Sequence, residues 1–321
     1  MKKSLFQYLL IAALPLIVSS CGDEPDIPTG PVGNLNANTA KRMDGVAFVP
    51  TEVGDYSYNY ISRMEMPAIT GNNCVFVTHV ASRYESNEVN LGTQVNYSVL
   101  YDKTRNHSRW IAYRFDKATS RVQTGRKDYS EKPQYPRDPL LKKDNALPDD
   151  LGFSGYDHGH LCASAERYFS AEANKQTFYM TDMSPQTGNF NQNYWTIYEK
   201  FIYSFARDGR IAPDTLYVVK GGTITEDKVI NRFTSGGYTI PVPKYYFVAC
   251  LAVKGGAYSA IGFWVEHKVP SWRSEKEELR KHAVPIDVLE QKTGFDFFCN
   301  LPDKAESIVE SNYDLAWWGI N

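Results

Sequence analysis

Long apolar runs are missing from all but the start of this 321-residue chain. The only such run, residues 9–18, follows Lys2 and Lys3 and is broken by Pro15. It is too short to cross a bilayer as a mature helix and is typical of the core of an export signal. No later stretch is apolar enough to span a membrane. We therefore expect an exported globular protein without membrane-spanning helices in its body.

Cysteine is also scarce, with five residues and no CxxC pair, which argues against a zinc site of paired cysteines. Cys21 lies at the end of the apolar leader. Cys74, Cys162, Cys250 and Cys299 are widely spaced. In an oxidising compartment they could form up to two disulfides, and their spacing does not assign the pairing.

Small residues precede Cys21 in Val18-Ser19-Ser20-Cys21, which resembles the lipobox of bacterial lipoproteins. The resemblance implies a signal peptide at 1–20 and a lipid on Cys21. The acidic residues 22–26 resemble signals that send some Gram-negative lipoproteins to the cell surface, so we expect attachment to the bacterial outer membrane, with surface exposure favoured by this segment. Residues 21–42 are rich in Pro, Gly, Asn and Asp and predict a flexible tether. The alternative is an ordinary signal peptide cut near a cysteine.

Net charge is also small, at −2, and neither favours nor excludes a polyanionic partner. The local distribution is more informative. Residues 101–143 contain twelve Lys or Arg against five Asp or Glu, an excess of seven. Either a solvated basic surface or a surface for a polyanion would have this composition.

Low-complexity breaks and internal repeats are absent beyond the tether, so residues 43–321 predict a single domain. Apolar and β-branched runs predict strands at 74–80, 96–101, 110–115, 215–219, 245–253 and 257–265. Turns are expected at 220–222 and 254–256. Helices are expected at 191–206, 274–281 and 286–292. Because strands outnumber helices without alternating with them, we predict an α+β fold around an antiparallel sheet.

An acid, two histidines and a glycine occupy four consecutive positions, Asp157-His158-Gly159-His160. A histidine with an ordinary pKa near 6.5 can accept a proton from water at neutral pH. Asp157 and, further along the chain, Asn191 offer oxygen ligands of the kind that suit Mg²⁺. Each residue alone has a simpler reading, since single histidines are usually hydrogen-bonded or on the surface and an Asn before a helix is usually a cap.

Asn191, Trp195 and Glu199 follow at intervals of four, which on a helix would place them along one broad side. Trp195 on that side could contact a substrate. The alternative for Trp195 is a place in the hydrophobic core.

The four-residue motif resembles the DRGH signature of the DNA/RNA non-specific endonucleases, which are ββα-metal (His-Me finger) nucleases. Pro185-Gln186, Asn191-Gln192, Trp195 and Glu199 resemble the pattern that follows this signature, at the same spacings. Segments 96–102, 110–113, 216–222 and 293–298 are similar to further landmarks of the family. The resemblance covers residues 60 to 302 and implies a ββα-metal active-site motif.

This resemblance implies a role for each matching residue. His160 would be the general base that deprotonates water. Asn191 would be the one direct protein ligand of Mg²⁺, for which Mn²⁺ could substitute, and Glu199 would hold a metal-bound water. Asp157 would orient the metal-binding residues without contacting the metal itself. Attack by water needs no ribose 2′-hydroxyl, so DNA and RNA are both expected substrates, cut with little sequence preference.

An arginine before the motif should face the phosphate. Arg126 is our choice by position, and Arg137 is the competitor. His158 stands where the family signature has Arg, so a phosphate contact there would be weaker or dependent on pH. Asp182 stands where Asn is more usual.

Two other functions fit the same residues. One is a non-catalytic lipoprotein that binds nucleic acid or a protein partner on this fold, against which intact His160, Asn191 and Glu199 argue. The other is a phosphodiesterase or phosphatase for small molecules, which the basic segment 101–143 disfavours. The oligomeric state is not determined by any of these features.

Overall fold

A computed structural model describes residues 34, 36–39, 46–48, 60–84, 90–271 and 274–320 of the chain. The predicted signal peptide, Cys21 and most of the predicted tether lie outside these residues. Within them, no helix is both long enough and apolar enough to cross a membrane.

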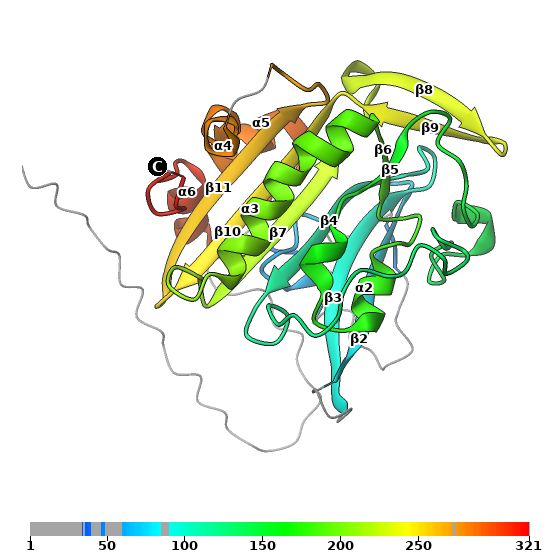
Figure 1. The fold of residues 1–321 in the computed structure, drawn as a ribbon. Coiled ribbons are helices and arrows are strands. Elements are labelled where there is room, and N and C mark those ends of the chain that lie inside the picture. The colour runs from blue at the N-terminus through cyan, green and yellow to red at the C-terminus, as the bar shows by residue number, and fades with distance from the viewer. Residues whose placement is uncertain are drawn as a thin grey trace, which may run out of the picture.

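The centre of the fold is an eight-stranded sheet in the order β1-β2-β3-β4-β7-β10-β11-β12 (Figure 1). Every neighbouring pair is antiparallel except β1 and β2, so the predicted α+β fold with an antiparallel sheet is confirmed. The strands are β1 (Ala47–Phe48), β2 (Cys74–Tyr84), β3 (Asn90–Asp102), β4 (His107–Phe115), β7 (Thr215–Gly222), β10 (Tyr245–Lys254), β11 (Ala257–Glu266) and β12 (Ala283–Val284).

Both faces of this sheet are covered. Helix α3 (Thr196–Arg207) crosses one face in front of β7 and β10 (Figure 1). Helix α5 (Ile286–Thr293) packs on the other face. Side chains of β10 alternate between the two cores, with Val248 in the first and Phe247 in the second, as the two-residue period of a strand requires. The central strands therefore read as continuous apolar runs because both of their faces are buried.

The turn predicted at 220–222 is wrong, because these residues finish strand β7. A Cβ atom on Gly221 would clash with the Phe247 ring, so the glycine permits close packing between strands. Lys220 is fully buried and pairs with Glu166, at 2.5 Å between Nζ and Oε1. The other predicted turn is confirmed, since Gly255 and Gly256 have positive φ angles of 56° and 80° between β10 and β11.

Two small hairpins lie beyond the main sheet. One joins β5 (Asp157–His160) to β6 (Met183–Gln186), and the other joins β8 (Val229–Ser235) to β9 (Tyr238–Pro243). The second was not expected, because β8 is polar and partly exposed and β9 contains two prolines, Pro241 and Pro243. The remaining α-helices are α2 (Ala171–Gln176), α4 (Glu275–His282) and α6 (Asp303–Glu310).

Cys74, Cys162, Cys250 and Cys299 are buried thiols, so the disulfides considered from the sequence do not form among the described residues. Cys162 and Cys250 pack in the first core and Cys74 in the second, as small apolar groups. The Cys299 thiol donates to the carbonyl of Met66 at 3.6 Å.

The expected tether also ends earlier than residue 42. Asn38 is 3% exposed, and its side chain bonds to the backbone of Ile61, Pro67 and Ile69. Asn34 donates to the carbonyl of Leu301. Asparagine-rich composition predicted a solvated linker, but here the amides satisfy buried backbone groups of the domain.

Candidate active site

The histidine motif lies on a strand of the β5–β6 hairpin. Asp157 pairs with Gln186 and His160 with Met183. Gly159 opposes Ser184, and the Gln186 side chain lies where a Cβ on Gly159 would be. Glycine at this position therefore lets the hairpin close under Gln186 while Asp157 and His160 stay at its two ends.

A π-helical segment, Phe190–Trp195, leads directly into α3. A π-helix has wider turns than an α-helix and occurs often at functional sites. The predicted spacing of four along one side therefore fails for Trp195, which is fully buried and donates from Nε1 to the carbonyl of His160 at 3.2 Å. Our assignment of Trp195 as a substrate contact is wrong: this residue supports the hairpin from the core.

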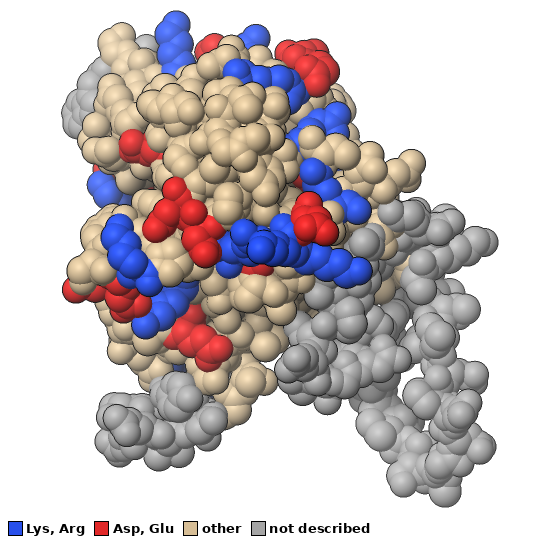
Figure 2. Space-filling view, turned by 90° about the vertical axis from the view of Figure 1, so that its right-hand side faces the viewer, with Lys and Arg blue, Asp and Glu red and all other residues tan. Residues whose placement is uncertain are grey.

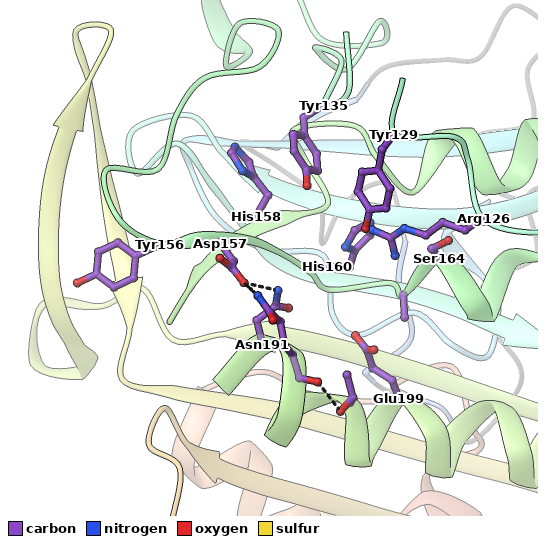
Figure 3. Close-up of a pocket in the computed structure, with 13 residues that line it drawn as sticks. Arg126, Tyr129, Tyr135, Tyr156, Asp157, His158, His160, Ser164, Asn191 and Glu199 are labelled. Atoms are coloured by element: carbon purple, nitrogen blue, oxygen red, sulfur yellow. Dashed lines mark hydrogen bonds between the residues drawn. The ribbon is translucent and has the colours of Figure 1, made fainter. Parts of the chain in front are cut away.

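One cavity of about 550 Å³ brings the remaining predicted residues together, apart from Arg137 (Figure 3). The hairpin, the π-helical segment, α3 and the loop before the hairpin all contribute to its wall. The lining residues are Arg126, Tyr129, Tyr135, Tyr156, Asp157, His158, His160, Ala163, Ser164, Asn191, Gln192, Thr196 and Glu199.

His160 is 7% exposed and lines this cavity. Its ring meets Phe178 edge to face, with centroids 5.0 Å apart. Nε2 has no hydrogen-bond partner among the described residues. Burial, aided by the charge of Arg126, holds the pKa of His160 well below its usual value. The imidazole is therefore neutral at pH 7 and able to accept a proton.

Asp157 fixes the start of the π-helical segment. Its Oδ2 accepts hydrogen bonds from Asn191 Nδ2 at 3.0 Å and from Gln192 Nε2 at 2.9 Å (Figure 3). Because the amide nitrogen of Asn191 points to Asp157, its amide oxygen remains available as a ligand for a cation. The sequence did not single out Gln192 as a partner of Asp157.

Glu199 lies in the first turn of α3, lines the same cavity and is half-buried. Desolvation raises its pKa to about 7, against the lowering effect of the charges on Lys220 and Arg126. Beneath it the buried Lys220–Glu166 pair also holds the Tyr113 hydroxyl, which donates to Glu166 at 2.6 Å. The wall of one cavity therefore carries both the His160 imidazole and the Glu199 carboxyl group.

Of the two candidate arginines, only Arg126 reaches the cavity. Its guanidinium lies over the rings of Tyr129 and Phe178, at 4.7 and 5.0 Å from their centroids. Arg137 instead donates from its side chain to the carbonyl of Lys143 at 3.2 Å. This geometry agrees with the choice of Arg126 by position. The competing assignment, Arg137 as the phosphate contact, is wrong, because Arg137 does not line the cavity.

His158 lines the cavity but is held as a structural residue. It stacks between Tyr135 and Phe153, both with centroids 4.1 Å away, and its Nε2 contacts the carbonyl of Leu151 at 2.8 Å. Burial lowers its pKa, so it is neutral at pH 7. This arrangement argues against its role as a cationic substitute for arginine at the phosphate.

Comparison with known proteins identifies the family. Residues 78–304 match the family model described as DNA/RNA non-specific endonuclease. The chain belongs to this family. A protein of the Nostoc species called "Nuclease" is 26% identical over 225 residues, covering 68% of this chain and 76% of that protein. "Nuclease 1, mitochondrial" of Schizosaccharomyces pombe is 28% identical over 211 residues, covering 64% of this chain and 65% of its own length.

Solved structures agree with the fold of this non-specific endonuclease. A chain from "Crystal structure of the EndoG/EndoGI complex: Mechanism of EndoG inhibition" superposes with a TM-score of 0.54 at 18% identity. The match covers 70% of this chain and 88% of the other. "Endonuclease G, mitochondrial" of Homo sapiens is 25% identical over 224 residues, which cover 68% of this chain and 72% of the human protein.

Nucleases of this family depend on a metal ion, and the cavity of this endonuclease fits a hard cation. Asn191 presents an amide oxygen, Glu199 a carboxylate, and Asp157 holds the amide in place. The unpartnered Nε2 of His160 lies in the same cavity. An oxygen donor set without cysteine suits Mg²⁺ or Mn²⁺ better than a soft metal.

Asp182 shows how this endonuclease tolerates an acid where its family usually has Asn. The side chain is fully buried, Oδ1 accepts from the backbone N–H of Cys162 at 2.7 Å, and Oδ2 has no partner among the described residues. Burial raises the pKa of Asp182 well above its usual value. A protonated carboxyl group has the size and neutrality of an amide, so it preserves the hydrogen bond to Cys162.

Asp182→Asn should therefore stabilise this endonuclease, increasingly so as pH rises. The unfolded chain releases the Asp182 proton near pH 4 whereas the folded chain retains it, so the acid destabilises the fold above that pH. We expect a gain of at least about 1 kcal/mol at pH 8, smaller at pH 5, measured by urea unfolding of both proteins. An equal or lower stability of the variant at pH 8 would mean that Asp182 is ionised in the fold.

Proposed function

We propose that this protein is a metal-dependent endonuclease that hydrolyses phosphodiester bonds of DNA and RNA with little sequence preference. Mg²⁺ is the proposed ion, and Mn²⁺ can substitute for it. The observation that carries this proposal is the single cavity that joins a neutral His160, Asn191, Glu199 and Arg126. Membership of the endonuclease family supports the same chemistry.

The residues of the chain divide the reaction between them. His160 Nε2 accepts a proton from a water molecule, and the oxygen of that water bonds to phosphorus as the bond to the leaving oxygen breaks. Arg126 donates to the phosphate, whose charge grows during attack. Asn191 and Glu199 hold the cation, which when bound supplies positive charge beside the phosphodiester. Phe178 packs edge to face against the His160 ring and helps to bury it.

Surface charge supports a long polyanion as substrate. Figure 2 shows Lys and Arg gathered in a band across one side of the molecule, with Asp and Glu around it. Within the basic segment 101–143, Arg105 and Arg114 form ion pairs with Asp102 and Asp116, which offset part of its positive charge. Contacts through phosphates rather than base edges would make cleavage nearly independent of sequence and sensitive to salt.

Closed circular plasmid DNA tests the proposal, because it has no ends and only an endonuclease can open it. The chain lacking residues 1–21 should nick and then degrade the plasmid, and degrade RNA, when Mg²⁺ is present. Retarded migration of DNA without cleavage would favour the binding protein. Hydrolysis of bis(p-nitrophenyl) phosphate without cleavage of plasmid or RNA would favour the small-molecule phosphodiesterase.

Arg126→Ala should lower kcat/KM for DNA cleavage by about 10²-fold, the usual cost of removing a donor that stabilises developing charge. Arg137→Ala is the matched control, because its guanidinium bonds to Lys143 outside the cavity. Steady-state kinetics on one oligonucleotide at constant salt compares the two. A larger loss with Arg137→Ala would reverse the assignment.

We also propose that the protein is attached to the outer membrane through a lipid on Cys21. The lipobox-like Val18-Ser19-Ser20-Cys21 supports this, together with the absence of a spanning helix in the described residues. Cys21→Ser should move the protein from the membrane fraction to the soluble fraction of the producing cells, because a lipid would be its anchor. Retention of the variant in the membrane fraction would indicate a different anchor.

A further inference from the structure

A group of acidic side chains lies on the face of the sheet opposite α3 and is separate from the catalytic cavity. Asp287 and Glu290 come from α5, and Glu310 ends α6. One ligand oxygen from each lies within 4.8 Å of the other two. No lining residue of the catalytic cavity belongs to this group.

Glu310 is the most informative member. It is 4% exposed, and its Oε1 is buried without a hydrogen-bond partner among the described residues. Burying a carboxylate oxygen without a hydrogen-bond partner costs free energy of folding, and native proteins rarely contain such an atom. Glu310 and Glu290 both line a separate cavity of about 540 Å³, so the side chain that carries the unpartnered oxygen borders a space with room for a ligand.

Positive charge does not compensate the three carboxylates. In the part of the chain that the structure describes, no Lys or Arg forms an ion pair with Asp287, Glu290 or Glu310. The only donor recorded for Glu290 is the backbone N–H of Phe297, at 2.7 Å. Burial and the neighbouring acids raise the pKa of Glu290 to about 7 and that of Glu310 to about 10. The group must therefore hold protons or a cation at neutral pH.

We propose that Asp287, Glu290 and Glu310 bind one structural Ca²⁺ ion that joins α5 to α6. All three donors are oxygens, which suit a hard cation, and there is no histidine or cysteine among them. Ca²⁺ accepts carboxylate oxygens from several side chains in a flexible shell, whereas Mg²⁺ demands a near-ideal octahedron and usually keeps several of its waters. Three carboxyl groups drawn from two helices therefore suit Ca²⁺ better than Mg²⁺.

The same ion would also stabilise the N-terminal residues that the structure describes. Asn36 lines this cavity, and its Nδ2 bonds to Glu306 of α6 at 2.9 Å and to Asp296 at 3.3 Å. Its Oδ1 is buried without a partner among the described residues. A cation held between α5 and α6 would keep the acceptors of Asn36 in position.

Thermal unfolding of the chelator-treated protein, with and without added Ca²⁺, tests the site independently of catalysis. The measurements use Asn191→Ala as the parent, so that binding in the catalytic cavity is weakened. Saturating Ca²⁺ should raise the Tm of this parent by about 5 °C or more. Isothermal titration with CaCl₂ should detect one site, and MgCl₂ should produce a smaller shift in Tm.

Glu310→Gln and Asp287→Asn, each made in the Asn191→Ala parent, should lose most of the Ca²⁺-dependent shift and bind Ca²⁺ at least about tenfold more weakly. Glu226→Gln is the matched control, because Glu226 is exposed and lies on a different element. Equal Ca²⁺ shifts in the parent and in both site variants would overturn the proposal. Absence of any Ca²⁺ response in the parent, with higher stability of Glu310→Gln, would show that shared protons hold the cluster instead.

Discussion

His160→Ala should reduce DNA and RNA cleavage by about 10²–10⁴-fold, the usual contribution of a general base, while the domain stays folded. Nε2 of His160 lies in the cavity without a protein partner, and burial keeps the ring neutral at pH 7. The backbone carbonyl that supports Trp195 is retained in the variant. Single-turnover cleavage of a labelled oligonucleotide measures the loss, and circular dichroism with a thermal melt checks the fold.

His158→Ala is the matched control on the same strand. It removes the stack with Tyr135 and Phe153, so it should cost stability more than it costs the chemical step. A larger catalytic loss from His158→Ala than from His160→Ala would mean that we have exchanged the two roles. Near-normal cleavage by a folded His160→Ala protein would remove the general base from the mechanism.

The acid limb of the pH profile should lie at or below about pH 7. His160 must be neutral to accept a proton, and its lowered pKa keeps it neutral well below pH 6.5. Glu199 must be ionised to hold a cation, and its pKa of about 7 is an upper limit, because a bound cation would lower it. A loss of activity beginning clearly above pH 7.5 would show that another group controls the rate.

Chelation should abolish cleavage, and Mg²⁺ or Mn²⁺ should restore it. The amide oxygen of Asn191 and the carboxylate of Glu199 are the proposed metal-binding groups, and both belong to the wall of the catalytic cavity. Plasmid nicking in EDTA, followed by addition of each ion in turn, measures this dependence. Full activity in the chelator would exclude the cation from the reaction.

Asn191→Ala should raise the Mg²⁺ concentration needed for half-maximal cleavage by at least about tenfold, while DNA affinity changes less. Asn193→Ala is the matched control: its amide bonds to Asn189, and it is not part of the cavity wall. Mg²⁺ titrations of both variants, with DNA binding measured in EDTA, separate the two effects. A similar Mg²⁺ requirement in both variants would argue against Asn191 as a ligand.

The sequence alone was sufficient for the sheet and for most of the active-site residues. Continuous apolar runs such as 245–253 determine strands because burial on both faces dominates their energetics. The spacing of His160, Asn191 and Glu199 matched a known signature, and the three residues meet in one cavity. Apolar runs and motif spacings depend only on the type of each residue and on its position in the sequence, so both can be read without the structure.

Tertiary packing decided what the pattern left open. A π-helical segment turned Trp195 into the core, although its spacing from Asn191 and Glu199 predicted the same side. Lys220 looked like the start of a turn and is instead a buried partner of Glu166. Arg126 and Arg137 differ only in which neighbours the fold brings to them, Phe178 for one and the Lys143 carbonyl for the other.

The sequence by itself therefore determined which chemical groups are present and the order of most strands and helices along the chain. Local periodicity and residue chemistry can both be read from neighbouring residues. Only the tertiary structure decided which of those groups face the cavity and which carry charge. Burial and distant neighbours raise the pKa of Asp182 well above its usual value and lower the pKa of His160 well below its usual value. Both effects depend on contacts between residues far apart in sequence, which no local pattern encodes.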